Sequence, residues 1–217
     1  MGLVWTLPGV YRPQADTRLL LRALRGAGLG RGARVLDLCT GTGVAAAEAA
    51  RCGAGEVIAV DTYLPAVLSA WLNTRGLPAR VRRGDLTGPL DGAPFDLVLA
   101  NPPYVPCASA RPARGAARAW DAGPDGRRFL DVLCERAVDL MTPGGTMLVV
   151  HSDICGVALT CESLRETGLK SSVVARAVEP FGPVLAERAA YLTEAGFIEP
   201  GQRYEELVVI RADRIEP

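Results

Sequence analysis

Lysine, histidine and paired cysteines are scarce in this sequence. Lys170 is the only lysine among 24 basic residues, and His151 is the only histidine. The cysteines show no C-x-x-C spacing, so neither a zinc site nor a disulfide framework is expected. The six cysteines are Cys39, Cys52, Cys107, Cys134, Cys155 and Cys161. We therefore predict no metal site and reduced thiols, as in a cytoplasmic protein.

The sequence also lacks an excess of either charge and any long apolar run. Basic and acidic residues number 24 each, and the isoelectric point is near 6.6. Overall charge thus argues against a nucleic-acid partner, since domains that bind nucleic acid usually have an isoelectric point above about 9. The sequence has no run of about 18 apolar residues, the length that a membrane-spanning helix needs. Its N-terminus lacks the basic region and apolar core of a signal peptide. We expect one soluble domain spanning residues 1–217.

What is present is an alternation of strand-like and helix-like segments. Apolar runs predict strands, and helical spacing of apolar residues predicts helices. Strands are expected at 34–38, 57–61, 79–82, 95–100, 147–150, 172–178 and 206–210, with helices at about 19–28, 44–51, 66–75, 129–140, 158–166 and 185–195. Residues 1–30 form a lead-in that ends in the first helix. This alternation predicts an α/β fold with a mainly parallel, doubly wound sheet.

A glycine-rich turn at residues 40–43 follows the first expected strand and leaves two cofactor classes open. The pattern Gly41-x-Gly43-x-x-Ala46, with Asp61 further on, fits a dinucleotide site and hence an oxidoreductase. Asp37, however, precedes the turn and would face a cofactor phosphate there. A carboxylate at this place suits S-adenosylmethionine, which carries an ammonium and a sulfonium and no phosphate.

The tetrapeptide Asn101-Pro102-Pro103-Tyr104 follows the expected strand at 95–100, where ligands bind in open α/β sheets. The Asn101 side-chain oxygen and the Pro102 carbonyl are suited to accept both N–H donors of a flat –NH2 group, with Tyr104 against its face. No carboxylate adjoins this loop in the sequence. We therefore expect the acceptor nitrogen to lose its proton to solvent and not to a dedicated base.

These motifs, in this order, resemble those of class I S-adenosylmethionine-dependent methyltransferases of the amino type. More narrowly, the segments 11–17, 119–126 and 143–145 resemble the HemK family, which methylates the glutamine of the Gly-Gly-Gln loop in translation release factors. The similarity covers about residues 8–211 and is greatest to the short archaeal and eukaryotic-like branch. The release-factor branch of the family commonly has an acidic residue where this chain has Ala15.

The resemblance implies a fold, a cofactor and a set of site residues. The fold is a Rossmann-like, seven-stranded, mainly parallel sheet with an antiparallel last strand and helices on both faces. The cofactor is S-adenosyl-L-methionine, leaving as S-adenosyl-L-homocysteine, and the lead-in closes over it. Its binding residues would be Tyr11, Thr17, Asp37, Thr40, Gly41, Gly43, Asp61, Tyr63, Asp85, Leu86 and Asn101. Asn101, Pro102 and Tyr104 would hold the acceptor amide.

Three functions are compatible with this reading. The first is methylation of a protein glutamine in a release factor by direct in-line displacement, aided in the family's short members by a small zinc-ribbon partner. The second is N-methylation of a small-molecule amine or amide, or of a nucleobase. The third is a non-catalytic cofactor-binding module. His151 is expected to be structural or to line the substrate site, and the cluster Arg111, Arg114 and Arg118 to be a solvated loop.

Overall fold

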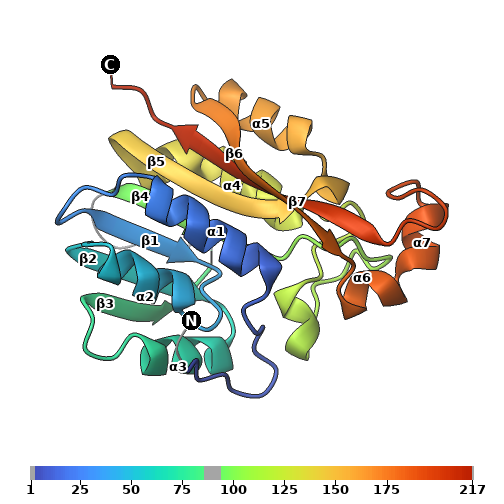
Figure 1. Ribbon diagram of the computed structural model, residues 1–217, viewed down its shortest axis with the longest axis horizontal. Helices are drawn as coiled ribbons and strands as arrows, with labels where there is room; N and C mark the ends of the chain where they lie inside the picture. The colour runs from blue at the N-terminus through green and yellow to red at the C-terminus, as the bar shows by residue number, and fades with distance from the viewer. Residues whose placement is uncertain (1–2, 86–93, 217) are drawn as a thin grey trace.

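The structure is a computed structural model that describes residues 3–85 and 94–216 (Figure 1). Its strands are β1 (Arg34–Leu38), β2 (Glu56–Asp61), β3 (Ala79–Arg83), β4 (Phe95–Ala100), β5 (Met141–Ser152), β6 (Lys170–Pro180) and β7 (Tyr204–Asp213). Its helices are α1 (Ala15–Gly26), α2 (Val44–Arg51), α3 (Leu64–Asn73), α4 (Arg128–Leu140), α5 (Val157–Glu166), α6 (Pro183–Glu187) and α7 (Ala189–Glu194), with 3-10 turns η1 (Gly115–Ala119) and η2 (Asp153–Cys155).

The seven strands form one sheet in the order β3-β2-β1-β4-β5-β7-β6. The pairs from β3 to β5 are parallel, and β7 runs antiparallel to both β5 and β6. The predicted fold class is therefore confirmed, including the antiparallel last strand. The chain adds β2 and β3 on one side of β1 and then returns to add β4 on the other side. This change of direction lies between β1 and β4, and doubly wound sheets bind ligands at such a point.

Helices cover both faces of the sheet (Figure 1). Leucines of α1 and alanines of α2 pack on one face, and apolar residues of α4 and α5 pack on the other. The alternation of side chains along each strand supplies both cores, since Val57 and Ala59 face α2 while Ile58 and Val60 face away. Within residues 3–85 and 94–216, no helix is long and apolar enough to cross a membrane.

Two predicted elements differ most from the observed ones. The strand expected at 147–150 extends over 141–152, because the pairing of β5 with β4 and β7 continues past its apolar centre. The single helix expected at 185–195 is two short helices that meet at Arg188. Arg188 forms an ion pair with Asp121 and donates to the carbonyl of Pro106, so the break joins these helices to the loop after β4.

The loop after β4 has its own small apolar core next to the carboxyl end of that strand. Val105, Leu185, Leu192 and Ile198 form it, and Tyr104 packs against it. The packing holds the end of β4 against α6 and α7, which lie together beyond the carboxyl end of β4 (Figure 1). The residues that follow β4 are therefore fixed by tertiary contacts as well as by their two prolines.

Candidate active site

Three polar residues, Asp37, Asp61 and Asn101, lie together at the carboxyl ends of neighbouring parallel strands. In the parallel register, Leu38 is opposite both Val60 and Ala100. Asp61 directly follows Val60, Asn101 directly follows Ala100, and Asp37 directly precedes Leu38. The carboxyl ends of β1, β2 and β4 thus bring together three of the residues that the sequence singled out.

Asp37 is a buried carboxyl group that organises the glycine turn. Its Oδ2 accepts hydrogen bonds from the Thr40 hydroxyl at 2.5 Å and from the Ala46 backbone N–H at 3.0 Å. Burial, only partly offset by these bonds, raises its pKa to about 7. Within the described residues its Oδ1 makes no hydrogen bond. Asp37 is thus able to respond to a positive charge placed beside it.

Asp61 closes the same turn from the end of β2. Its two oxygens accept from the backbone N–H groups of Gly41 and Tyr63, each at 2.9 Å. Burial raises the pKa of Asp61, while these bonds and the charge of Arg118 oppose the rise. Because each carboxylate oxygen has a second lone pair, Asp61 can still accept two further hydrogen bonds.

The turn also requires glycine at position 43. Gly43 has φ +78°, and a Cβ atom there would lie 2.7 Å from Cα of Ala70 in α3. The predicted roles of Gly41 and Gly43 in a tight backbone turn are consistent with this geometry. The turn, the start of α2 and α3 are consequently packed as one unit.

The lead-in crosses over α3 and reaches the same edge. The Trp5 backbone exchanges two hydrogen bonds with the Asn73 side chain, at 2.8 and 2.7 Å. Asn73 also donates to the carbonyl of Thr42 in the glycine turn. A Cβ atom at Gly9 would lie 2.8 Å from the Tyr63 hydroxyl, so the lead-in touches Tyr63 closely.

The loop after β4 meets a carboxylate that the sequence reasoning missed. Asn101 Nδ2 donates to Oδ2 of Asp16 at 3.2 Å, and the Tyr104 hydroxyl donates to the same oxygen at 3.3 Å. The Tyr11 hydroxyl adds a third bond at 3.0 Å, and Thr17 Oγ1 lies 3.4 Å from Asn101 Nδ2. The expectation that no carboxylate adjoins this loop is therefore wrong.

A signal for Asp16 existed in the sequence. Asp16 lies three and four residues before Leu19 and Leu20, so it shares the apolar face of α1. It is 3% exposed, as expected for a residue on that face. An acid at a buried helical position usually has polar partners, but those partners are 85 and 88 residues away and no local pattern names them.

The atoms that would receive an acceptor –NH2 group remain open. Neither the Asn101 side-chain oxygen nor the Pro102 carbonyl accepts a hydrogen bond from the described residues. Burial and the nearby Asp16 carboxylate raise the pKa of Tyr11 and of Tyr104, which keeps both hydroxyls protonated and donating. The Tyr104 carbonyl is held by the Cys155 thiol at 2.8 Å.

Two remaining predicted cofactor residues are less well defined. Asp85 follows β3 by two residues, at the outer edge of the sheet. Leu86 lies outside the described residues. The predicted set is thus centred on β1, β2 and β4, with Thr17 and Tyr11 brought in by α1 and the segment before it.

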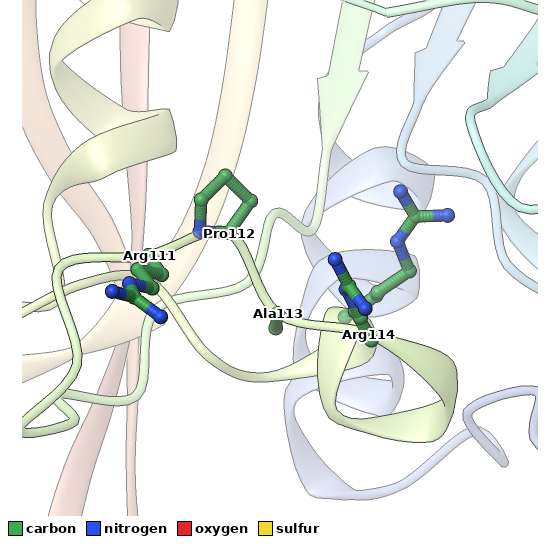
Figure 2. Close-up of a pocket in the computed structure, with 5 residues that line it drawn as sticks. Arg111, Pro112, Ala113 and Arg114 are labelled. Atoms are coloured by element: carbon green, nitrogen blue, oxygen red, sulfur yellow. The ribbon is translucent and has the colours of Figure 1, made fainter.

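His151 and the arginine cluster lie apart from these contacts. The His151 ring is fully buried, its Nδ1 lies 2.8 Å from the Ser152 carbonyl, and burial lowers its pKa to about 4. This setting is compatible with the structural role expected for His151. Arg111, Arg114 and Arg118 line a hollow of about 460 Å³, with Arg111 and Arg114 on opposite sides of the Pro112–Ala113 segment (Figure 2). The positive charge of Arg118 opposes the rise in the pKa of Asp61.

A third buried carboxyl group, after Asp37 and Asp16, lies on the α1 side of β7. Glu205 is 8% exposed, and its Oε2 has no hydrogen-bond partner among the described residues. It shares a strand face with Leu207, which packs in the α1 core. Burial raises its pKa to about 7, with Asp16, Asp153 and Glu179 adding to the rise and Ser152 opposing it.

The raised pKa values of Asp37 and Glu205 predict that each group makes the fold less stable as pH rises. Both keep a proton up to about pH 7 when folded, whereas the unfolded chain releases it near pH 4. Each group should therefore lower the free energy of unfolding between about pH 4 and 7, by at most about 1.4 kcal/mol per pH unit, whereas the lowered pKa of His151 acts in the opposite direction over about pH 4 to 6.5. Urea unfolding of Asp37→Asn and Glu205→Gln should each show a shallower fall. A variant whose free energy of unfolding keeps the pH dependence of the wild type would contradict the assignment for that group.

Known proteins share both sequence and fold with this chain. The family profile described as the methyltransferase small domain matches residues 2–114. The release factor glutamine methyltransferase of Mycolicibacterium smegmatis is 36% identical over 179 residues, which are 78% of this chain and 63% of that protein. This chain thus spans less than two thirds of that relative. A Methanocaldococcus jannaschii protein with the provisional name protein N5-glutamine methyltransferase is 30% identical over 84% of this chain and 92% of its own length.

Two further relatives differ in what their names describe. The 4-amino-L-phenylalanine/4-methylamino-L-phenylalanine methyltransferase of Streptomyces pristinaespiralis is 32% identical over 66% of this chain and 54% of its own length. The solved Mtq2–Trm112 complex of E. cuniculi, responsible for the methylation of the termination factor eRF1, contains a chain that is 26% identical with a TM-score of 0.65. The match covers 95% of this chain and 99% of that chain. Taken with the sheet order and the glycine turn, these similarities place the chain in the HemK family of class I S-adenosylmethionine-dependent methyltransferases.

Proposed function

We propose that this protein transfers a methyl group from S-adenosylmethionine to the side-chain amide nitrogen of a glutamine in a translation release factor. The observation that carries the proposal is the state of Asn101. Its –NH2 group is engaged by Asp16 and Thr17, so its oxygen is the atom left to accept a hydrogen bond. An oxygen held at the end of β4 suits an acceptor that is itself a flat –NH2 group.

The residues around the glycine turn fit S-adenosylmethionine. Asp61 has two lone pairs free for the ribose hydroxyls, and Asp37 has a free oxygen that would become ionised beside the ammonium group. Thr40, Gly41 and Gly43 would contact the methionine end through the turn. S-adenosylmethionine, when bound, supplies an electrophilic methyl group on a positively charged sulfur.

Further residues would complete the cofactor site. Tyr63 would lie near the adenine, with Asp85 accepting from its amino group and Leu86 against the ring. The lead-in of residues 1–30 would close over the cofactor, with Tyr11 and Thr17 as its inner contacts. The observed contacts of the lead-in with Tyr63 and with Asn73 support this placement.

The chain would promote transfer mainly by positioning. The Asn101 oxygen and the Pro102 carbonyl would accept both N–H groups of the acceptor, and the Tyr104 ring would pack against its face. Such alignment can supply up to about 7–11 kcal/mol of the barrier. Asp16 Oδ2 already accepts three hydrogen bonds, which assign it to holding Tyr11, Asn101 and Tyr104 in place. The proton released by the acceptor nitrogen would therefore go to solvent, after a direct in-line displacement at the methyl carbon.

A small zinc-ribbon partner would fit the β3 end of the molecule. The similarity to the Mtq2 chain of the Mtq2–Trm112 complex supports such a partner. Leu64, Leu68 and Trp71 lie on one face of α3 and are 49%, 46% and 53% exposed. Trp5 of the lead-in, 60% exposed, lies beside them through its bonds to Asn73. With a release factor as substrate, the protein would act in the cytoplasm.

A small aromatic amine is the second candidate acceptor. The 4-amino-L-phenylalanine methyltransferase acts on such a compound and is 32% identical to this chain. An aromatic amine also presents a flat –NH2 group and suits the same two oxygen acceptors. The two candidates differ in size, so they are separable by experiment.

Transfer of labelled methyl from S-adenosylmethionine tests the proposal. The purified protein, with and without a zinc-ribbon partner, would be given a release factor, the same factor with the Gly-Gly-Gln glutamine changed to alanine, 4-amino-L-phenylalanine and total RNA. Label on the unmodified factor alone is expected. Label on the amino acid would move the function to small-molecule N-methylation, and label on RNA would move it to a nucleobase. No label on any acceptor while the cofactor binds would refute catalysis of this type.

A further inference from the structure

We propose that Asp16 is the positioning residue of the acceptor site: it fixes the side-chain amide of Asn101 so that the oxygen points to the acceptor. The inference rests on the proposed function and names a residue beyond it. A side-chain amide can turn over to exchange its oxygen and nitrogen, and only one of the two orientations serves an –NH2 acceptor. Something in the site must therefore select that orientation.

Asp16 selects it by chemistry alone. An ionised carboxylate can only accept hydrogen bonds, so the group of Asn101 that faces it must be the –NH2. The Nδ2–Oδ2 distance of 3.2 Å and the burial of Asp16 at 3% exposed leave no room for an intervening water. A reversed Asn101 would set two oxygens against each other in a buried place.

The other contacts of Asp16 hold its carboxylate in place. Its Oδ1 accepts from the Thr17 backbone N–H at 2.5 Å, within the first turn of α1. Its Oδ2 accepts from the hydroxyls of Tyr11 and Tyr104. One carboxylate thus ties the lead-in, the first helix and the loop after β4 together, although these segments are far apart in the sequence.

Asparagine at position 16 is the sharpest perturbation, since it keeps the shape and changes only the donors. With its –NH2 in place of Oδ2, it would face the –NH2 of Asn101. With its –NH2 in place of Oδ1, it would face the Thr17 N–H. Either orientation sets two donors against each other, so Asn101 would be expected to turn over or move away. A displacement of about 1 Å at such a site costs roughly 100-fold in rate.

The reciprocal exchange should restore the contact. In the double variant Asp16→Asn with Asn101→Asp, the amide introduced at position 16 would donate to the carboxylate introduced at position 101. The second oxygen of that carboxylate would then face the acceptor. We expect Asp16→Asn to lower kcat by about 100-fold, and the double variant to recover at least about tenfold of that loss. Asp139→Asn, on the exposed side of α4, is the matched control and should behave as wild type.

Nuclear magnetic resonance supplies a readout that needs no acceptor. The chain has only two asparagines and two glutamines, so it gives few side-chain –NH2 signals. The signal of Asn101 is identified as the one that disappears in Asn101→Asp. In Asp16→Asn the Asn101 –NH2 signal should shift and exchange faster with water. An unchanged signal, a wild-type kcat, or a double variant no better than Asp16→Asn would overturn the proposal. Failure of glutamine methylation by the wild type would instead refute the proposed function, and the signal would still test Asp16.

Discussion

Asn101→Ala is expected to lower the rate of methyl transfer by about 100- to 1,000-fold while leaving cofactor affinity within a few-fold of wild type. Removing one well-placed hydrogen-bond group from a buried catalytic site has an effect of this size. The variant takes away the oxygen that would accept from the –NH2 group, and it leaves the Asp37 and Asp61 contacts of the glycine turn intact. Single-turnover rates with saturating S-adenosylmethionine measure the loss, and calorimetry measures the affinity.

Asn101→Asp separates the oxygen from the amide. It keeps an acceptor atom toward the substrate but places a carboxylate against Asp16, which makes like charges meet in a buried place. We expect its rate to lie between those of wild type and Asn101→Ala, and to improve as pH falls and one carboxyl takes up a proton. If Asn101→Ala kept a wild-type rate, Asn101 would not be the group that holds the acceptor.

Asp61→Asn is expected to weaken S-adenosylmethionine binding by about 100-fold, or about 2.7 kcal/mol. Both carboxylate oxygens of Asp61 accept from backbone N–H groups, those of Gly41 and Tyr63. An amide has only one oxygen, so the –NH2 group of the variant would face one of these two N–H donors. The variant would also have one acceptor fewer for the ribose hydroxyls. The turn and the ribose contact would be disturbed together.

Titration calorimetry with S-adenosylmethionine and with S-adenosylhomocysteine measures this loss. The affinity for both ligands should fall by a similar factor, because both contain the ribose. Asp139→Asn, an exposed acid on α4, is the matched control and should bind as wild type. Equal affinity of wild type and Asp61→Asn would remove Asp61 from the cofactor site, while a large drop in melting temperature without ligand would show that Asp61 mainly supports the turn.

The local parts of the site were determined by the sequence. Asp37 is the last residue but one of an apolar strand, Asp61 ends another and Asn101 directly follows a third, and parallel strands bring their carboxyl ends together. For this reason Asp37, Asp61 and Asn101 could be placed together before any tertiary contact was known. The glycine turn was likewise predictable, because a positive φ at Gly43 follows from the sharp change from strand to helix.

Only the tertiary structure decided which groups complete the acceptor site. Asp16 reaches Asn101 because the leucine face of α1 packs on the sheet, which sets the start of the helix beside the end of β4. Glu205 reaches the same region because β7 runs antiparallel to β5 and begins where β5 ends. Such contacts join residues far apart in the chain, and their formation depends on packing and register, for which a single sequence carries no local pattern.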